Sequence, residues 1–241
     1  MERARSRSIF IATPIARHPV RQYTTALHLT CVMLAGLGIR AWVQNTVGAS
    51  NLPRARNDLV AAFLASDYDD LLFIDDDMGW NPGDVIRLMA SEQAVIGGVG
   101  CKKTLLADTA KEKWCFRALK GGRFVQDDFG AIEVEAVGTG FLKISREVFE
   151  TMKAAHPDWK RNGWHDTPAE HKPHCYRFFA FDPDDPEEKG EDIAFCMEWR
   201  RLGGRVFIDP TIRLVHVGEM EFTGDFTALL EPAPQYREAA E

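Results

Sequence analysis

Residues 71–74 form a continuous apolar run, Leu-Leu-Phe-Ile, that ends directly in three aspartates, Asp75, Asp76 and Asp77. A strand that is apolar at every position has no solvent-facing side, so other elements must cover both of its faces. The segments around this run alternate between strand and helix patterns. That alternation predicts an α/β fold with a mainly parallel central sheet flanked by helices, whose ligands bind at the carboxyl ends of the strands.

The first half of the chain supplies most of this alternation. Apolar and β-branched runs predict four strands, over residues 8–14, 39–47, 71–74 and 94–99. Three helices are predicted, over residues 20–37, 53–65 and 82–90. Asn51 is the expected cap of the second helix, and Pro82 suits the first turn of the third. The first helix is expected to bury the face that carries Leu27, Cys31 and Leu34.

The second half is less regular, and we expect a small antiparallel extension there. Residues 104–130 suit either loops or one antiparallel strand. Strands are predicted over residues 132–137, 141–144, 205–208 and 212–216, and helices over 145–155 and 191–202. Residues 156–190 are rich in Pro, His, Asp and aromatics, which is typical of a long functional loop, and the acidic stretch 182–188 is expected to be solvated and mobile.

The composition is that of a soluble globular protein, with 45% hydrophobic and 27% charged residues. No apolar run approaches the ~20 residues that a transmembrane helix needs. The apolar stretch after the basic N-terminus is too short for a signal peptide and stops at Pro14. The five cysteines are odd in number and lack paired spacing, which indicates reduced thiols. We therefore expect a cytoplasmic protein of one domain.

The charge distribution is uneven. The formal net charge is −7, yet the first 57 residues hold eight arginines, no lysine and a single acid, Glu2. This part of the chain could therefore face an anion, although solvated arginines are an equally ordinary explanation.

The aspartate triplet is the strongest chemical signal. Three consecutive carboxylates repel one another, so a cation that neutralises them is favoured. Residues two apart on an extended chain point the same way, so Asp75 and Asp77 can converge on one ion while Asp76 turns elsewhere. Oxygen ligands suit Mg²⁺ or Mn²⁺, which act as Lewis acids on a leaving diphosphate. An acidic solvated turn is the alternative.

This order of elements resembles that of GT-A glycosyltransferases, whose DxD motif follows an apolar strand and matches Asp75-Asp76-Asp77. The resemblance extends over about residues 8–218 and rests on motif order. It implies a nucleotide-binding half over 8–100, a half that completes the acceptor and metal sites over 101–218, and a peripheral tail over 219–241. The implied reaction moves a sugar from a UDP- or GDP-linked donor to a hydroxyl acceptor, which could be a glycan, a lipid, a protein or modified DNA.

The resemblance also implies roles for individual residues. The donor contacts would come from Thr13, Pro14, Arg54, Arg56, Asn57, Asp75, Asp76, Gly138, Thr139 and Gly140. The metal ligands would be Asp75, Asp77 and the late histidine His216. Asp192 would face the acceptor and act as general base if the anomeric centre inverts, with Glu191 in reserve.

Each of these residues also has an ordinary structural interpretation. Guanidinium groups such as Arg54 bind phosphate bidentately, but they also occupy exposed helix faces. Glycine pairs often form turns, and carboxylates at a helix start, such as Asp192, are favoured by the helix dipole. Lys102 and Lys103 could meet donor phosphates or be solvated. A lone histidine at a strand end, such as His216, is often only buried and hydrogen-bonded.

Three competing hypotheses remain open. His171, His174 and Cys175 are close enough in sequence to share a zinc ion, although no fourth ligand is evident. A nucleotidyltransferase acting on sugar phosphates would also place carboxylates at strand ends, but it normally has a glycine-rich loop after the first strand, where this chain has none. A non-catalytic module that binds nucleotide sugars or polyanions would suit the basic first quarter and would not need Asp192.

Overall fold

The computed structural model describes residues 2–48, 50–104, 114–122, 124–181 and 184–230. The strands of its central sheet are β1 (Ile9–Ile15), β2 (Ala41–Val47), β3 (Asp70–Ile74), β5 (Val95–Gly97), β7 (Ile132–Val134), β9 (Phe141–Ser145) and β10 (Val206–Ile208). Their order in the sheet is β2-β1-β3-β9-β5-β10-β7. β9 and β7 run antiparallel to their neighbours, and the other pairs are parallel. The predicted mainly parallel α/β sheet is confirmed, and the arrangement is consistent with a GT-A-like fold.

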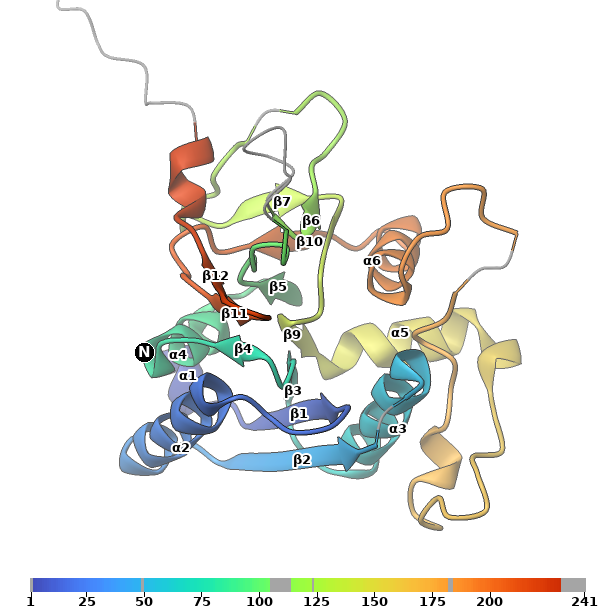
Figure 1. The fold of residues 1–241 in the computed structure, drawn as a ribbon. Coiled ribbons are helices and arrows are strands. Elements are labelled where there is room, and N and C mark those ends of the chain that lie inside the picture. Colours follow the sequence, from blue (N-terminus) through green and yellow to red (C-terminus); the bar gives the residue numbers. More distant parts are fainter. Residues whose placement is uncertain (1, 49, 105–113, 123, 182–183, 231–241) are drawn as a thin grey trace, which may run out of the picture.

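Helices cover both faces of this sheet (Figure 1). One face packs against α1 (Glu2–Arg5), α2 (Arg21–Gly36) and α4 (Pro82–Ala90), and the other against α3 (Leu52–Ala65), α5 (Arg146–Ala155) and α6 (Glu191–Arg201). Successive residues of a strand alternate between the two cores. Leu71 belongs to the core under α3, and Leu72 to the core under α2. The continuous apolar run of β3 therefore has the two covered faces that it requires.

The buried face of α2 differs from the predicted one. The fully buried residues are Tyr23, Ala26, Thr30 and Leu34; of the predicted residues, Leu34 is buried, Leu27 packs partly buried against the core and Cys31 is half-buried. The prediction considered only apolar residues, whereas two residues of the buried face, Tyr23 and Thr30, have hydroxyl groups with hydrogen-bond partners. The indole Nε1 of Trp80 donates to the Thr30 hydroxyl at 2.9 Å, and this hydrogen bond offsets the desolvation cost of burying the hydroxyl.

A second, three-stranded antiparallel sheet confirms the small antiparallel extension that was predicted, although its strands differ from the expected ones. It consists of β4 (Met78–Gly79), β11 (Val215–Val217) and β12 (Glu221–Thr223), in the order β12-β11-β4. The strand expected over residues 212–216 is thus only β11, which begins three residues later than predicted. Antiparallel pairing sets His216 opposite Met78, the residue that follows the aspartate triplet.

The expectation for the tail requires a correction. Residues 219–230 are not peripheral, because β12 pairs with β11 and Phe226 is 1% exposed. The Phe226 ring packs against Trp114 with a centroid distance of 5.2 Å. An aromatic side chain buried this deeply contributes strongly to core stability, which ties the segment to the fold. Residues 231–241 lie outside the described residues.

The two irregular regions contain only short elements. In the segment expected to be loops or one strand, β6 (Phe116–Arg117) pairs antiparallel with β8 (Ala136–Val137), and residues 105–113 lie outside the described part. Residues 156–181 contain two 3-10 turns, Pro157–Trp159 and Lys172–His174. In the acidic stretch, Asp185 accepts hydrogen bonds from the backbone of Glu187 and Lys189, while residues 182–183 lie outside the description. Within the described ranges, no helix has the length and apolarity to cross a membrane.

Candidate functional site

The carboxyl end of β3 meets the glycine segment that precedes β9. The backbone N–H of Asp75 donates to the carbonyl of Gly140 at 3.1 Å. A Cβ placed on Gly140 would lie 3.4 Å from Asp75 Oδ2, and one on Gly138 would lie 3.5 Å from Asp192 Oδ2. Both distances are ordinary van der Waals contacts, so the two carboxylates lie directly beside the backbone of this segment. Together these groups line a cavity of about 100 Å³.

The small sheet brings His216 to the aspartate triplet. The backbone N–H of Val217 donates to the Asp77 carbonyl at 2.8 Å. The His216 Nδ1 atom lies 2.6 Å from the carbonyl oxygen of Cys101, which can only accept, so Nδ1 carries the proton. The other ring nitrogen, Nε2, lies 3.5 Å from Asp77 Oδ1. This is the orientation in which a backbone carbonyl fixes a histidine for metal binding.

Asp77 supplies an observation that bears directly on a cation. Its Oδ1 atom is buried and has no hydrogen-bond partner among the described residues. The Nε2 atom of His216 faces this negative oxygen, and a cation that contacts both atoms would be stabilised there. On the other side, Lys103 Nζ contacts Asp77 Oδ2. Although burial raises the pKa of Asp77, its contacts with His216 and Lys103 hold it below the ordinary value.

The third predicted ligand, Asp75, is directed elsewhere. Its carboxylate accepts from Arg56 Nη2 at 3.0 Å. In the described part of the chain, no three His, Cys, Asp or Glu side chains are placed to hold a metal ion, which applies equally to the set Asp75, Asp77, His216 and to the set His171, His174, Cys175. The structure therefore brings together Asp77 and His216, with Asp75 beside them on the wall of the cavity. Two protein ligands are compatible with Mg²⁺ or Mn²⁺, which often take the remainder from phosphate and water.

Arg56 links the end of β3 to the start of α6. It is 2% exposed, and its guanidinium contacts Glu191 through Nη1 and Asp75 through Nη2. Glu191 is also buried. Both residues thus belong to a buried ion-pair network, and removing one partner would strongly lower the free energy of unfolding. Arg56 positions the Asp75 carboxylate and also pairs with Glu191, so a single guanidinium charge faces two carboxylates.

Asp192 is the acid of the predicted pair that faces the cavity. Its Oδ1 accepts from the backbone N–H of Ile193 at 2.7 Å, an arrangement expected for the first turn of a helix. Burial raises the pKa of Asp192, and the nearby charge of Asp75 adds to the rise, whereas Arg56 opposes it. A carboxylate with a raised pKa is a stronger base than an exposed aspartate, which is suited to proton abstraction.

Two further groups, Thr139 and Cys115, line the wall of the cavity. Thr139 was expected to contact donor, and its buried Oγ1 has no hydrogen-bond partner within the described ranges, so it is available to a polar ligand. Cys115 was not predicted as a site residue, although it lines the same cavity. Burial raises the pKa of its thiol to about 11, so the thiol is neutral at physiological pH and a poor nucleophile.

The residues predicted at the end of β1 hold the fold together. The Thr13 hydroxyl is fully buried and hydrogen-bonds the Tyr23 hydroxyl at 2.7 Å, and Pro14 is buried in the same strand. Asp76 Oδ2 accepts from the backbone N–H of Ala16 at 3.2 Å. Burial, reinforced by the charges of Asp77 and Asp75, raises the pKa of Asp76. Asp76 thus ties the aspartate triplet to the loop after β1.

The arginine-rich start of α3 divides between two faces of the helix. Asn51 caps it as predicted, accepting from the Arg54 backbone N–H at 3.0 Å. Asn57 exchanges hydrogen bonds with the backbone of Phe179, at 2.7 and 2.9 Å, and so fixes the 156–181 segment to the helix. Arg54 points away from Arg56 and stacks on Trp164. Arg54, Arg56 and Asn57 therefore do not form one cluster.

Comparison with known proteins adds little to this geometry. No protein-family profile and no curated protein matches the sequence. Among solved structures, the chain is similar to a glycosyltransferase involved in the glycosylation of the major capsid of PBCV-1. The identity is 11%, the TM-score is 0.36, and the match covers 84% of this chain and 94% of that chain. The functional argument accordingly rests on the site itself.

Proposed function

We propose that this chain is a metal-dependent glycosyltransferase that moves a sugar from a nucleoside-diphosphate donor to a hydroxyl acceptor. The observation that supports this most strongly is the pair formed by Asp77 and His216. The buried Oδ1 atom of Asp77 has no hydrogen-bond partner in the described structure and faces Nε2 of His216. The carbonyl of Cys101 fixes the tautomer of this histidine through Nδ1. A divalent cation held there would supply Lewis-acid stabilisation to the leaving diphosphate.

The chain's own groups have separate tasks in this proposal. Asp77 and His216 would hold the ion, and Lys103, already paired with Asp77, would contribute positive charge near the diphosphate. Asp75, positioned by Arg56, and the Thr139 hydroxyl would contact the donor across the small cavity. Gly138 and Gly140 line the same cavity beside these groups.

Asp192 would act on the acceptor. In a transfer that inverts the anomeric centre, the acceptor oxygen forms a bond to the anomeric carbon while the bond from that carbon to the diphosphate breaks. Asp192 takes the proton that the acceptor hydroxyl loses, and the diphosphate leaves with the electron pair of the broken bond. The raised pKa of Asp192 favours this proton transfer. The acceptor enters the proposal only as a hydroxyl compound.

A nucleotide-sugar screen by thermal shift tests the binding half of the proposal. UDP- and GDP-sugars with Mn²⁺ should raise the melting temperature, by an amount that corresponds to about 2.7 kcal/mol at 100 times the Kd. The metal-dependent part of the shift should disappear in Asp77→Ala and in His216→Ala. Asp128→Asn, an exposed aspartate away from the site, is the matched control. A full shift in both site variants would contradict the proposed ligands.

The proposed base predicts a pH dependence. Asp192 must be ionised to accept a proton, so kcat/KM should fall as the pH is lowered through its pKa. Because burial raises that pKa, the acid limb should lie above the ~3.9 of an ordinary aspartate. A pH profile recorded at saturating Mn²⁺ measures this midpoint. A rate that is constant down to about pH 4 would rule out Asp192 as the base.

A further inference from the structure

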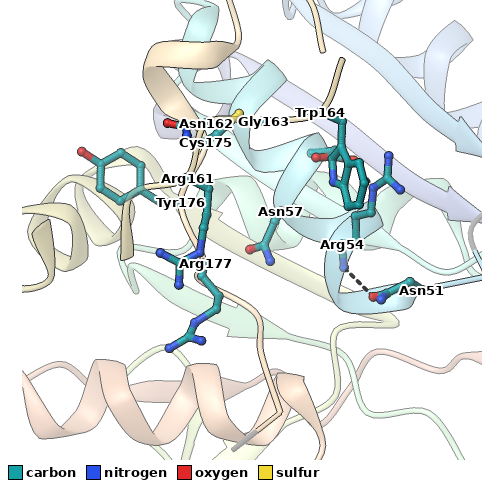
Figure 2. A pocket seen from close by; sticks show the side chains of 11 residues that line it. Asn51, Arg54, Asn57, Arg161, Asn162, Gly163, Trp164, Cys175, Tyr176 and Arg177 are labelled. Atoms are coloured by element: carbon teal, nitrogen blue, oxygen red, sulfur yellow. Dashed lines mark hydrogen bonds and ion pairs between the residues drawn. The ribbon is translucent and has the colours of Figure 1, made fainter. Parts of the chain in front are cut away.

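A second cavity lies on the other face of α3. It has a volume of about 340 Å³ and lies between the first turns of α3 and residues 161–177. Figure 2 shows Arg54, Trp164 and Asn51 on one side of it and Arg161 and Arg177 on the other, with Asn57 between them. Arg54 and Arg56 are two positions apart on the helix and so project about 200° apart. This cavity is therefore separated by the helix from the carboxylates that Arg56 contacts.

The cavity is strongly basic, although the chain as a whole carries a net charge of −7. Its lining contains three arginines and one aspartate. The aspartate, Asp58, pairs with Arg54 at 3.6 Å. Arg161 donates only to the backbone carbonyls of Asp158 and Lys160, and neither Arg161 nor Arg177 has a carboxylate partner among the residues described. Two guanidinium charges on one wall are therefore left for an anion, and this group binds phosphate well.

The opposite wall offers an aromatic platform. The guanidinium of Arg54 lies 3.9 Å from the centre of the Trp164 ring, and Trp164 remains 53% exposed. On the side of Arg161 and Arg177, the half-buried ring of Tyr176 also lines the cavity, and the amine of Lys160 lies 5.1 Å from its centroid (Figure 2). An exposed aromatic ring close to cationic side chains is an arrangement that holds bases and phosphates of single-stranded nucleic acids.

We propose that this cavity binds a nucleotide unit, with the phosphate between Arg161 and Arg177 and the base stacked on Trp164. The unit could belong to a free nucleotide or to a single-stranded nucleic acid, since both present the same phosphate and planar ring. The proposal does not depend on sugar transfer, because Arg161, Arg177 and Trp164 have no role in the donor, metal or acceptor chemistry above.

Fluorescence anisotropy with 5′-fluorescein-labelled hexathymidylate tests the proposal on the full chain, in EDTA so that no metal-bound diphosphate site contributes. The probe should bind saturably. The double variant Arg161→Gln/Arg177→Gln should weaken binding at least about ten-fold, and Trp164→Ala at least about five-fold. The double variant should also flatten the slope of log affinity against log salt by about 0.7, the value for one lost phosphate contact with a single strand.

Matched controls separate this site from general charge. Arg5→Gln/Lys120→Gln removes two exposed cations elsewhere, and Asp77→Ala removes the proposed metal ligand; both should retain the affinity of the unmodified chain. Unlabelled thymidine 5′-monophosphate that competes as well per nucleotide as the unlabelled hexamer identifies a free nucleotide as the ligand, and competition by the hexamer alone identifies a strand. Either result supports the proposal.

Three results would overturn it: no saturable binding, equal affinity in the cavity variants and the charge control, or equally strong competition by maltohexaose, which has no charge. Arg161, Arg177 and Trp164 are exposed, so the variants should fold, and far-UV circular dichroism verifies this. A negative result would leave the proposed transferase untouched, because the Asp77 and Asp192 variants test that activity separately.

Discussion

Replacing Asp192 with asparagine is expected to lower the rate of sugar transfer by about 10²–10⁴-fold, the range for loss of a general base. The amide has nearly the same shape but cannot accept the acceptor's proton. Donor binding should persist, because Asp192 is assigned to the acceptor. Initial rates and Kd values for the nucleotide sugar, measured on Asp192→Asn and on the control Asp128→Asn, separate these effects.

The same variant should be more stable than the unmodified chain at neutral pH. A carboxyl whose folded-state pKa is raised binds its proton more tightly in the folded protein than in the unfolded one. Its ionisation therefore costs stability as the pH rises from the unfolded value of ~3.9 through the folded value. Asparagine removes that cost, and the gain should vanish at pH values below both pKa values. Undiminished transfer by a stable Asp192→Asn protein would refute the assignment and favour a binding module.

The second large effect is expected at Arg56. Arg56→Met should lower the free energy of unfolding by about 3–5 kcal/mol, because Glu191 and Asp75 then lose the cation that pairs with them at a buried position. Urea denaturation followed by circular dichroism measures the change. Arg54→Met is the matched control: the Arg54 side chain is 41% exposed, so a change within about 0.5 kcal/mol is expected.

The two arginine variants also distinguish a structural role from a direct donor contact. If Arg56→Met loses as little stability as Arg54→Met but no longer binds nucleotide sugar, Arg56 contacts the ligand directly and does not act through Asp75. Glu191→Gln provides a further comparison. Burial raises the pKa of Glu191 as it raises that of Asp192, so neither Glu191→Gln nor Asp192→Asn should lower the stability at neutral pH as Arg56→Met does.

Much of the fold could be predicted because its pattern is local. The apolar run before Asp75 required two covering layers, and Asn51 and Pro82 marked helix starts that the structure reproduces at Leu52 and Pro82. The face of α2 could not be predicted in the same way. Its burial depends on Tyr23 and Thr30, whose hydroxyls find partners in Thr13 and Trp80, both distant in sequence.

The site was predicted in composition better than in geometry. Spacing along an extended strand suggested that Asp75 and Asp77 act together, but the strand ends at Ile74 and the chain turns, so their carboxylates face Arg56 and His216 respectively. The pairing of β4 with β11 that brings His216 to Asp77 joins residues 138 positions apart, and no local pattern encodes it. Arg161 and Arg177 gave no signal, because their cavity forms only when Asn57 holds the 156–181 segment.

The central claim is metal-dependent sugar transfer, and release of nucleoside diphosphate from nucleotide sugars tests it most directly. Chromatographic quantification of UDP and GDP, with a panel of donors and hydroxyl acceptors, should show release that requires Mn²⁺ or Mg²⁺. EDTA and Asp77→Ala should each abolish it, and Asp192→Asn should reduce it. Release that continues unchanged in EDTA and in Asp77→Ala would contradict the account.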